Sequence, residues 1–364
     1  MKEKNKIGIL TLTPTSNYGG ILQSIALYHF LEREGYDVRL INKKFKINSI
    51  IKKTYLYVLQ RLPGQNLRGF RKSFLKSKAL AHNINNLIPK RTKKLFNLKS
   101  FREHCNQENY DAVIVGSDQV WRYSYINDGS FSCYFLDFNK KLQTKKISYA
   151  ASFGSETWEN KETESTVKSL LKDFDSISCR EESGVNLCKD LFDVKAAHVL
   201  DPTLLLSSQS YSKIFSLKIT KESKTLCTYI LDNNKKKCDY TSKISENNSL
   251  SLIALNGSNS IYGLDEWVAA IKNSKLVITD SFHGMVFSII FRRQFIVIGN
   301  RKRGLARFES LLLKLGLQDR LIEADCLDDS IDLVNTIIDY DQIEPIIERE
   351  KKFSEDFLKN SLIN

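Results

Sequence analysis

Polar residues with the chemistry to bind or transform an anion occur in four short stretches, each of which follows the end of a predicted strand. These stretches are residues 17–20, 116–121, 178–181 and 279–284. Short apolar runs are typical of buried parallel strands, and ligands of open parallel sheets gather at the carboxyl ends of the strands. We therefore take these four stretches as the source of candidate site residues.

The stretch 279–284 contains the strongest candidate for proton transfer, His283. It follows the apolar run 276–278 and stands at the start of a helix predicted over 284–292. There an imidazole can protonate or bind a phosphate leaving group, because the helix dipole favours the anion. The alternative is a purely structural histidine, but the neighbouring Asp280 and Ser281 favour a functional one.

The stretch 116–121 combines groups that suit a sugar. Asp118 can accept a proton from a sugar hydroxyl, and Trp121 can stack on a sugar ring, with Gln119 between them. The alternative is a junction of strand and helix in which Asp118 caps the helix and Trp121 lies in the core.

The other two stretches offer groups for an anion. Gly19 and Gly20 allow the backbone to approach a ligand at a helix N-terminus, although an ordinary turn would look the same. Arg180 ends a predicted strand and presents a planar fork for a carboxylate or phosphate. Its alternative role is a salt bridge to a nearby acidic side chain, of which Asp201 is one.

Alternating strands and helices must position these residues. In the first half we predict strands over 7–12, 37–41, 111–115 and 146–150, with a helix over 20–34. In the second half we predict strands over 225–231, 250–255, 275–279 and 294–298, with helices over 265–273, 284–292 and 305–315. This alternation predicts an α/β fold with two Rossmann-like domains facing a cleft. We place the domains at 1–180 and 181–340, followed by a C-terminal helix within 341–364.

One segment carries the whole positive excess of the chain. The net charge is +13, yet residues 38–102 hold 18 Lys or Arg and no Asp or Glu. We interpret this segment as a basic insertion in the first domain, forming one basic surface. A solvated face, a nucleic-acid contact and an anionic membrane contact are its three interpretations.

The four stretches, together with residues 146–154 and 200–205, resemble the polysaccharide pyruvyl transferase family in sequence and order. The resemblance implies a GT-B-like fold and transfer of pyruvate from phosphoenolpyruvate to sugar hydroxyls, which closes a ketal in cell-surface glycan synthesis. It places Arg180 and His283 on the family's catalytic positions. One departure is Ser281, where better-characterised members carry an arginine, and Arg292, Arg293, Arg303 and Arg307 are candidates to replace that cation.

We therefore expect His283, Arg180 and Asp118 to be catalytic and Gln119 and Trp121 to bind the acceptor. The donor is expected to contact Asn17, Tyr18, Gly19, Gly116, Ser117, Ser281, Gly284 and Arg307. Phosphoenolpyruvate is the expected co-substrate, with no cofactor or metal. The acceptor is a saccharide, with a lipid-linked acceptor as one form.

The family context favours membrane contact for the basic segment, and we expect no nucleic-acid partner. We expect a cytoplasmic protein, associated at most peripherally with the inner face of the membrane, because no apolar run approaches the ~20 residues that span a bilayer. Two other functions remain open, a glycosyltransferase that uses a nucleotide sugar and a non-catalytic relative.

Overall fold

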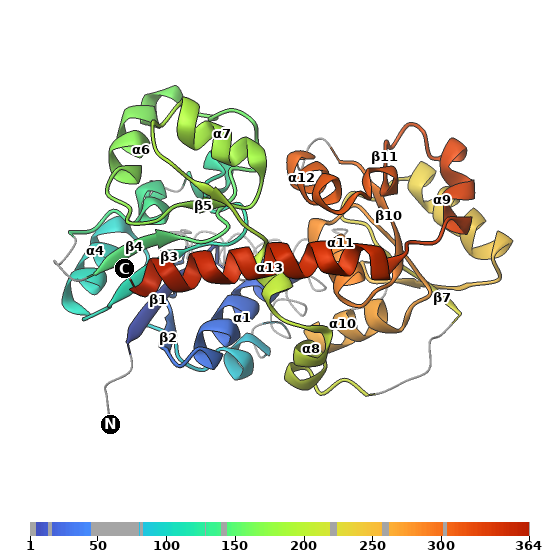
Figure 1. The fold of residues 1–364 in the computed structure, drawn as a ribbon, viewed down its shortest axis with the longest axis horizontal. Helices are drawn as coiled ribbons and strands as arrows, with labels where there is room; N and C mark the ends of the chain where they lie inside the picture. Colours follow the sequence, from blue (N-terminus) through green and yellow to red (C-terminus); the bar gives the residue numbers. More distant parts are fainter. Residues whose placement is uncertain are drawn as a thin grey trace, which may run out of the picture.

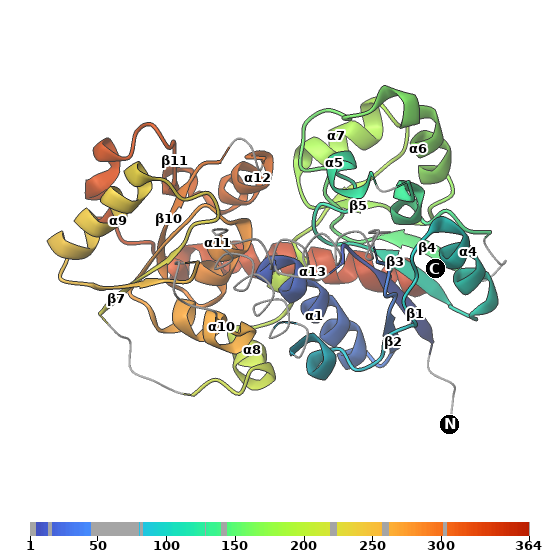
Figure 2. The same cartoon turned by 180° about the vertical axis from the view of Figure 1, so that it is seen from behind.

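The computed structural model describes residues 5–13, 17–44, 80, 83–127, 129–139, 144–218, 224–256, 262–300 and 304–363. They form two α/β lobes side by side, and a long C-terminal helix runs along both (Figure 1). The view from behind shows the same division (Figure 2). The predicted fold class of two Rossmann-like domains is confirmed.

The first lobe is built on a parallel sheet with the strand order β2-β1-β3-β4. Its strands are β1 (Lys6–Leu10), β2 (Asp37–Leu40), β3 (Ala112–Val115) and β4 (Lys145–Ser148). A short parallel pair, β5 (Ser178–Cys179) and β6 (Ala197–His198), is joined to the β4 edge by isolated bridges. The helices of this lobe are α1 (Tyr18–Arg33), α4 (Leu98–Gln107), α5 (Tyr123–Ile126), α6 (Glu164–Leu171) and α7 (Glu182–Asp190).

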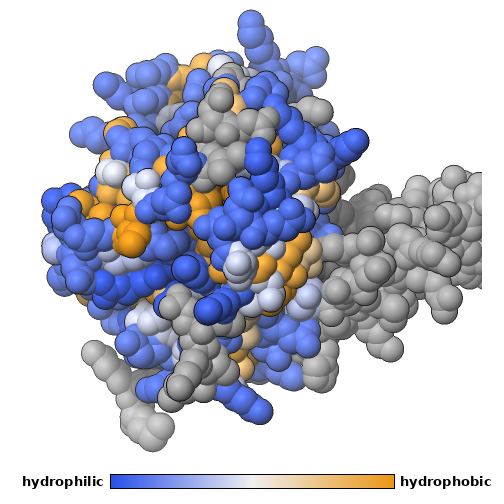
Figure 3. All heavy atoms as spheres, turned by 90° about the vertical axis from the view of Figure 1, so that its right-hand side faces the viewer, coloured by the Kyte–Doolittle hydropathy of each residue, from blue (hydrophilic) through white to orange (hydrophobic). Residues whose placement is uncertain are grey.

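The second lobe contains a parallel sheet with the strand order β11-β10-β9-β7-β8. Its strands are β7 (Thr225–Tyr229), β8 (Ser251–Ala254), β9 (Leu276–Thr279), β10 (Gln294–Ile298) and β11 (Leu321–Ile322). Its helices are α8 (Ser208–Ile214), α9 (Lys235–Asn247), α10 (Leu264–Asn273), α11 (Phe282–Ile290) and α12 (Ala306–Leu315). The end of the molecule on this side is largely hydrophilic, with separate apolar patches (Figure 3).

Short 3₁₀ helices connect these elements. They are η1 (Phe131–Phe135), η2 (Lys161–Thr163), η3 (Pro202–Leu205), η5 (Gln318–Arg320) and η6 (Asp328–Asn335). Of these, η3 stands at the junction of the lobes, where it packs against α1 of the first and α11 of the second.

The apolar runs form strands because helices cover both faces of each sheet. All four residues of β3 and all four of β9 are buried. A strand buried on both faces needs apolar side chains at every position, so its sequence shows no alternation. The polar residues that follow such strands are thereby held at the edge of the sheet.

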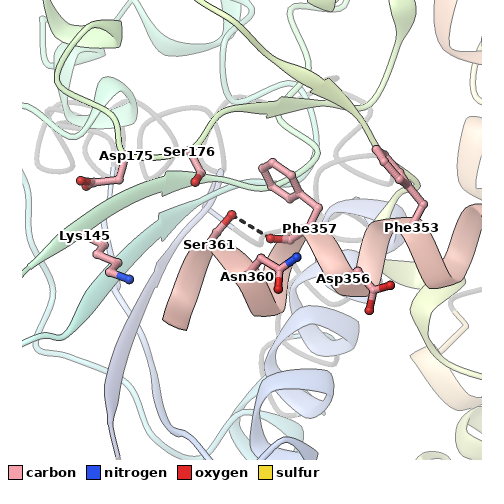
Figure 4. Close-up of a pocket in the computed structure, with 8 residues that line it drawn as sticks. All are labelled: Lys145, Asp175, Ser176, Phe353, Asp356, Phe357, Asn360 and Ser361. Atoms are coloured by element: carbon pink, nitrogen blue, oxygen red, sulfur yellow. Dashed lines mark hydrogen bonds between the residues drawn. The ribbon is translucent and has the colours of Figure 1, made fainter. Parts of the chain in front are cut away.

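The C-terminal helix α13 (Tyr340–Ile363) ties the two lobes together. At its start Tyr340 donates a hydrogen bond to the carbonyl of Arg293 in the second lobe. Further along, the Ser354 hydroxyl accepts one from the Leu200 N–H, and Lys359 Nζ lies 3.0 Å from the Glu34 carboxylate in the first lobe. Close to its end the helix borders a cavity of about 610 Å³, toward which Phe357 is directed (Figure 4). No helix in the described ranges is both long and apolar enough to cross a membrane.

Two sequence-based assignments need comment. The boundary placed at 180/181 falls inside a structural unit, because α7 and β6 pack and pair with β5 of the first lobe. We therefore place the end of this lobe after residue 198. The basic segment 38–102 contains β2 and part of α4, but its residues 45–79 and 81–82 lie outside the described residues.

Candidate active site

The four polar stretches meet where the lobes join. Asp118 follows β3 and Arg180 follows β5, and these two side chains form a salt bridge of 3.3 Å. His283 is the second residue of α11 in the other lobe, and it lies against Gly19 at the start of α1. The structure thus brings the three predicted catalytic residues into one buried group, which we call the junction cluster: Asp118, Arg180, Asp201, His283 and Arg307.

Arg180 is the centre of this cluster. Its Nη1 donates to Asp201 Oδ2 at 2.8 Å and its Nη2 to Asp118 Oδ1 at 3.3 Å. Burial alone would lower the pKa of Arg180, but the charge of Asp201, followed by that of Asp118, raises the pKa above its usual value. The salt bridge named as the alternative role of Arg180 is therefore present, inside the candidate site.

Asp201 contacts both lobes through its Oδ2 atom. It was not among the predicted site residues. Its Oδ2 accepts from Arg180 and from the Ser117 hydroxyl at 3.1 Å, and lies 3.7 Å from His283 Nε2. Its Oδ1 accepts the N–H and hydroxyl of Thr203, which caps η3. Burial opposes the charge of Asp201, but His283 and then Arg180 outweigh it and hold the pKa of this carboxyl well below its usual range.

His283 is held by close packing rather than by a hydrogen bond. A methyl group added to Gly19 would lie 2.0 Å from His283 Nδ1, so the imidazole rests directly on the first turn of α1. Its side chain is only 5 % exposed. Among the described residues, neither His283 Nε2 nor Arg180 Nε has a hydrogen-bond partner, although both atoms are buried. Buried polar atoms left in this way are uncommon and frequently mark functional sites.

Arg307 of α12 is the second guanidinium of the cluster. Its Cζ lies 5.6 Å from the centre of the Phe282 ring, against which Arg180 also packs at 4.7 Å. Burial, followed by the charge of Arg180, lowers the pKa of Arg307 to about 10. Arg307 therefore packs against the residue that follows Ser281, the position where the resemblance implies an arginine.

The other candidates for that cation are elsewhere or not described. Arg292 pairs with Asp341 at the start of α13, and Arg293 donates to the carbonyl of Phe291. Arg303 lies outside the described residues.

Backbone groups of the first lobe position the cluster. Asn17 accepts the Gly19 N–H as the N-cap of α1, and a methyl at Gly20 would lie 3.2 Å from Asp118 Oδ2. Gly116 has a φ of +130°, and a methyl there would lie 2.0 Å from the Tyr149 carbonyl oxygen. The Ser117 N–H donates to the buried Gln23 Oε1 at 2.9 Å. Gly116 thus serves the fold rather than the approach of a ligand.

Two aromatic side chains predicted to bind ligands lie instead in packed cores. Trp121 is fully buried, stacks on Phe135 at 5.5 Å and donates from Nε1 to the Tyr134 carbonyl, so it cannot reach a sugar. Tyr18 stacks on Trp267 of the second lobe at 5.6 Å. Both predictions are wrong, because each ring is needed for packing.

The remaining predicted residues have structural contacts. Gly284 faces β9, where a methyl would lie 2.4 Å from Thr279 Oγ1, so its small size serves the packing of helix on strand. Ser281 is the N-cap of α11, without a capping hydrogen bond from its side chain. Gln119 Oε1 accepts from Arg122 Nη1 at 2.8 Å, and its predicted contact with the acceptor stays a prediction.

Comparison with known structures identifies the same arrangement of lobes. The chain is similar to an Arabidopsis thaliana glycosyltransferase UGT89C1 complexed with UDP-L-rhamnose (TM-score 0.52, 9 % identity, 100 % of both chains). It is similar to a Neisseria meningitidis UDP-GlcNAc 2-epimerase bound to UDP-GlcNAc (TM-score 0.53, 11 % identity, 98 % of this chain and 100 % of the other). A putative UDP-N-acetylglucosamine 2-epimerase from Listeria monocytogenes gives a TM-score of 0.53 at 12 % identity, with 98 % of both chains. At these identities the similarity shows a shared GT-B-like fold.

Sequence comparison is more specific. No curated protein matches the chain. The family model for polysaccharide pyruvyl transferases, in contrast, matches residues 17–302, from the N-cap of α1 to beyond β10. This range includes Asp118, Arg180, Asp201 and His283. The chain therefore belongs to the polysaccharide pyruvyl transferase family.

Proposed function

We propose that the protein transfers pyruvate from phosphoenolpyruvate to two hydroxyls of a saccharide, forming a ketal and releasing phosphate. The observation that carries this proposal is the convergence of two guanidinium groups and an imidazole at the lobe junction. Arg180 and His283 both lie within 4 Å of Asp201 Oδ2. Arg307 packs against the same phenyl ring as Arg180.

The cluster suits a small substrate with two anionic groups. Phosphoenolpyruvate carries a carboxylate and a phosphate, and charged donors in a water-poor site bind such groups strongly. The lowered pKa of Arg307 means that its charge is disfavoured there, by burial first and by Arg180 second. A bound anion would relieve this repulsion, and it would offer a partner to the buried Arg180 Nε and His283 Nε2, which have none among the described residues.

The reaction needs one proton donor and one proton acceptor. A sugar hydroxyl adds to C2 while C3 is protonated, the C2–O bond to phosphate breaks, and a second hydroxyl attacks C2. The two hydroxyl protons end on C3 and on phosphate, so the reaction balances. We assign the donor role to His283 and the acceptor role to Asp118, whose carboxylate is fixed by Arg180 at 3.3 Å.

A phosphate-release assay with phosphoenolpyruvate and a panel of saccharides tests this function. His283→Ala is expected to lower turnover by about 10²-fold or more, the usual contribution of a general acid. The matched control is His29→Ala in α1 of the first lobe, eleven residues beyond Tyr18 along the helix, roughly 16 Å at 1.5 Å per residue. Circular dichroism shows whether both variants are folded.

Thermal shift separates this proposal from the nucleotide-sugar alternative, because a ligand that binds the folded state raises its melting temperature. Phosphoenolpyruvate is expected to stabilise the wild-type protein and UDP is not. Stabilisation by UDP alone, or full turnover by His283→Ala, would contradict the proposal.

A further inference from the structure

A cavity of about 680 Å³ is lined by residues of both lobes. The loops after β7, β10 and β11 of the second lobe form most of its wall, and Tyr125 of α5 reaches it from the first lobe. Its polar lining consists mainly of Tyr125, Asp232, Asn234, Asn300, Glu323 and Asp325. Ligand pockets typically occupy about 300–1,000 Å³, so a mono- or disaccharide fits this volume.

The described lining is acidic and neutral rather than basic. Three carboxylates, Asp232, Glu323 and Asp325, are accompanied by one cation, Lys237. Lys237 Nζ is engaged by the fold, since it donates to Asp280 Oδ2 at 2.8 Å and to the Asp232 carbonyl at 2.9 Å. The carboxylate and amide oxygens of these described residues can accept hydrogen bonds from hydroxyl groups.

The polar groups of the cavity are already fixed in place. Asn300 Nδ2 donates to Asp232 Oδ2, and Asn234 Oδ1 accepts the Lys237 N–H as the N-cap of α9. Groups held in this way lose little conformational entropy when a ligand binds. Asn300 is buried at the cavity wall, so its contact with Asp232 is shielded from most solvent.

Tyr125 supplies an aromatic surface on the opposite side. It is 39 % exposed, which is unusual among the large apolar and aromatic side chains of the described residues, and the Arg122 guanidinium supports its ring at 4.9 Å. An amphipathic ring of this kind offers an apolar face to the C–H groups of a sugar and a hydroxyl to its oxygens. Tyr125 is thus an exposed aromatic residue that can stack on a sugar ring, which is the role predicted for Trp121.

Short stretches of the chain and hydrogen bonds connect residues of the cavity wall to residues near the junction cluster. Asp280 accepts the N–H groups of Leu231 and Asp232, and it is followed directly by Ser281 at the N-cap of α11. Leu305 lines the cavity two residues before Arg307, and Tyr125 is close enough to Arg307 to affect its pKa. Residues of the cavity wall are therefore close to residues of the cluster in the chain.

We infer that this cavity binds the saccharide acceptor through its hydroxyl groups. Tyr125 provides the surface for the sugar ring, and Asp232 and Asn300 hold its hydroxyls. The inference rests on the proposed function, in which the anionic donor occupies the junction cluster. It assigns acceptor binding to residues that the sequence motifs do not contain.

Steady-state kinetics with Asn300→Ala and Tyr125→Ala tests this assignment. Each is expected to raise the acceptor KM about tenfold, the effect of losing roughly 1.4 kcal/mol of binding, with the KM for phosphoenolpyruvate unchanged. Asn248→Ala is the control, because Asn248 caps the opposite end of α9 and lies outside the cavity. An unchanged acceptor KM in both cavity variants, or a parallel rise in the phosphoenolpyruvate KM, overturns the inference.

Direct binding keeps the test independent of turnover. Methyl β-galactoside, methyl β-N-acetylglucosaminide and UDP are compared as probes by calorimetry. The two neutral glycosides are expected to bind the wild type and Asn248→Ala, and to bind Asn300→Ala and Tyr125→Ala more weakly. If this pattern is found but phosphoenolpyruvate is not turned over, the proposed donor is wrong. The cavity then remains a saccharide site. Binding of UDP that depends on Asn300, or glycoside binding unaffected by both variants, overturns the inference.

Discussion

The junction cluster and the cavity beside it are both polar, yet they are built in opposite ways. In the cluster, Arg180 and Asp201 are 1 % and 0 % exposed, and these two opposite charges lie 2.8 Å apart. In the cavity, carboxylates and amides border open space and the described lining carries an excess of negative charge. A buried group of balanced charges fixes a geometry for an anion, whereas an open acidic wall accepts hydroxyls of varied position. The difference teaches that, in the proposed function, the anionic donor and the saccharide acceptor are bound by separate sets of side chains.

The largest effect is expected from breaking the cluster at Asp201. Asp201→Asn keeps the shape of the side chain but leaves Arg180 and His283 without their shared anion. Removing one partner of a buried ion pair costs about 3–5 kcal/mol, so the free energy of unfolding in urea should fall by about that amount. Asp325→Asn in the exposed cavity wall is the matched control, with an expected change within about 0.5 kcal/mol. If the two variants lose equal amounts of unfolding free energy, the junction cluster and the cavity wall do not differ in the way described here.

A second effect concerns the position of the imidazole. Gly19→Ala adds a methyl 2.0 Å from His283 Nδ1, which must displace the ring or the start of α1. Since a misplacement of about 1 Å can cost about 10²-fold in rate, kcat should fall by that order while the acceptor KM changes little. Gly20→Ala, whose methyl meets Asp118 Oδ2 at 3.2 Å, is expected to lose less activity. Greater loss in Gly20→Ala would contradict this ranking.

A third, smaller effect tests how the lobes are held around the cluster. Tyr18→Phe keeps the stacking on Trp267 but removes the hydrogen bond from the hydroxyl to the Tyr262 carbonyl, 2.7 Å away. The expected loss in unfolding free energy is about 1 kcal/mol. Tyr28→Phe, which removes a bond to Glu32 within the same helix, is the control for phosphoenolpyruvate affinity. Only Tyr18→Phe is expected to weaken that affinity, and equal affinities would show that this anchor does not support the cluster.

Much of the fold follows from the sequence because its strands are uninterrupted apolar runs. The runs that became β3 and β9 were located to within a residue, since burial on both faces demands apolar side chains at each position. The pair β5 and β6 was harder, because strands of two residues leave almost no pattern. The predicted boundary at 180/181 fell inside this pair for that reason.

The candidate site was predictable only in part. Strand ends locate Asp118, Arg180 and His283, because parallel strands deliver their carboxyl ends to one edge of a sheet. Sequence does not show which way an aromatic ring after a strand turns, so Trp121 was placed at a ligand although its ring fills the core. Asp201 precedes a proline and resembles an ordinary turn, and Tyr125 has no pattern around it. Their roles depend on the docking of the lobes, which local sequence does not encode.

The smallest effect is expected from His198, which connects the backbone of Arg180 to α12, the helix that contains Arg307. Its Nε2 lies 3.2 Å from the Arg180 carbonyl oxygen and 3.1 Å from Ser310 Oγ of α12, and its Nδ1 lies 2.8 Å from Glu182. Burial, followed by the charge of Lys314, lowers the pKa of His198 below its usual value. The unfolded chain therefore binds a proton more readily. The stability contributed by neutral His198 is present above the unfolded pKa of about 6.5 and is lost as the pH falls from there toward the folded pKa.

Urea midpoints of the wild type and His198→Gln at about pH 7.5 and about pH 5.5, on either side of the unfolded histidine pKa, measure this effect. Glutamine keeps polar groups at this position and does not titrate, so the variant should lose less stability on acidification than the wild type. Burial also lowers the pKa of His29 and His104, so one substitution removes only part of the dependence of stability on pH. If the urea midpoints of the wild type and His198→Gln change equally with pH, the contact between Arg180 and α12 does not respond to the charge of His198. The dependence of the cluster on lobe docking would then rest on other contacts, among them those of Asp201 and Tyr18.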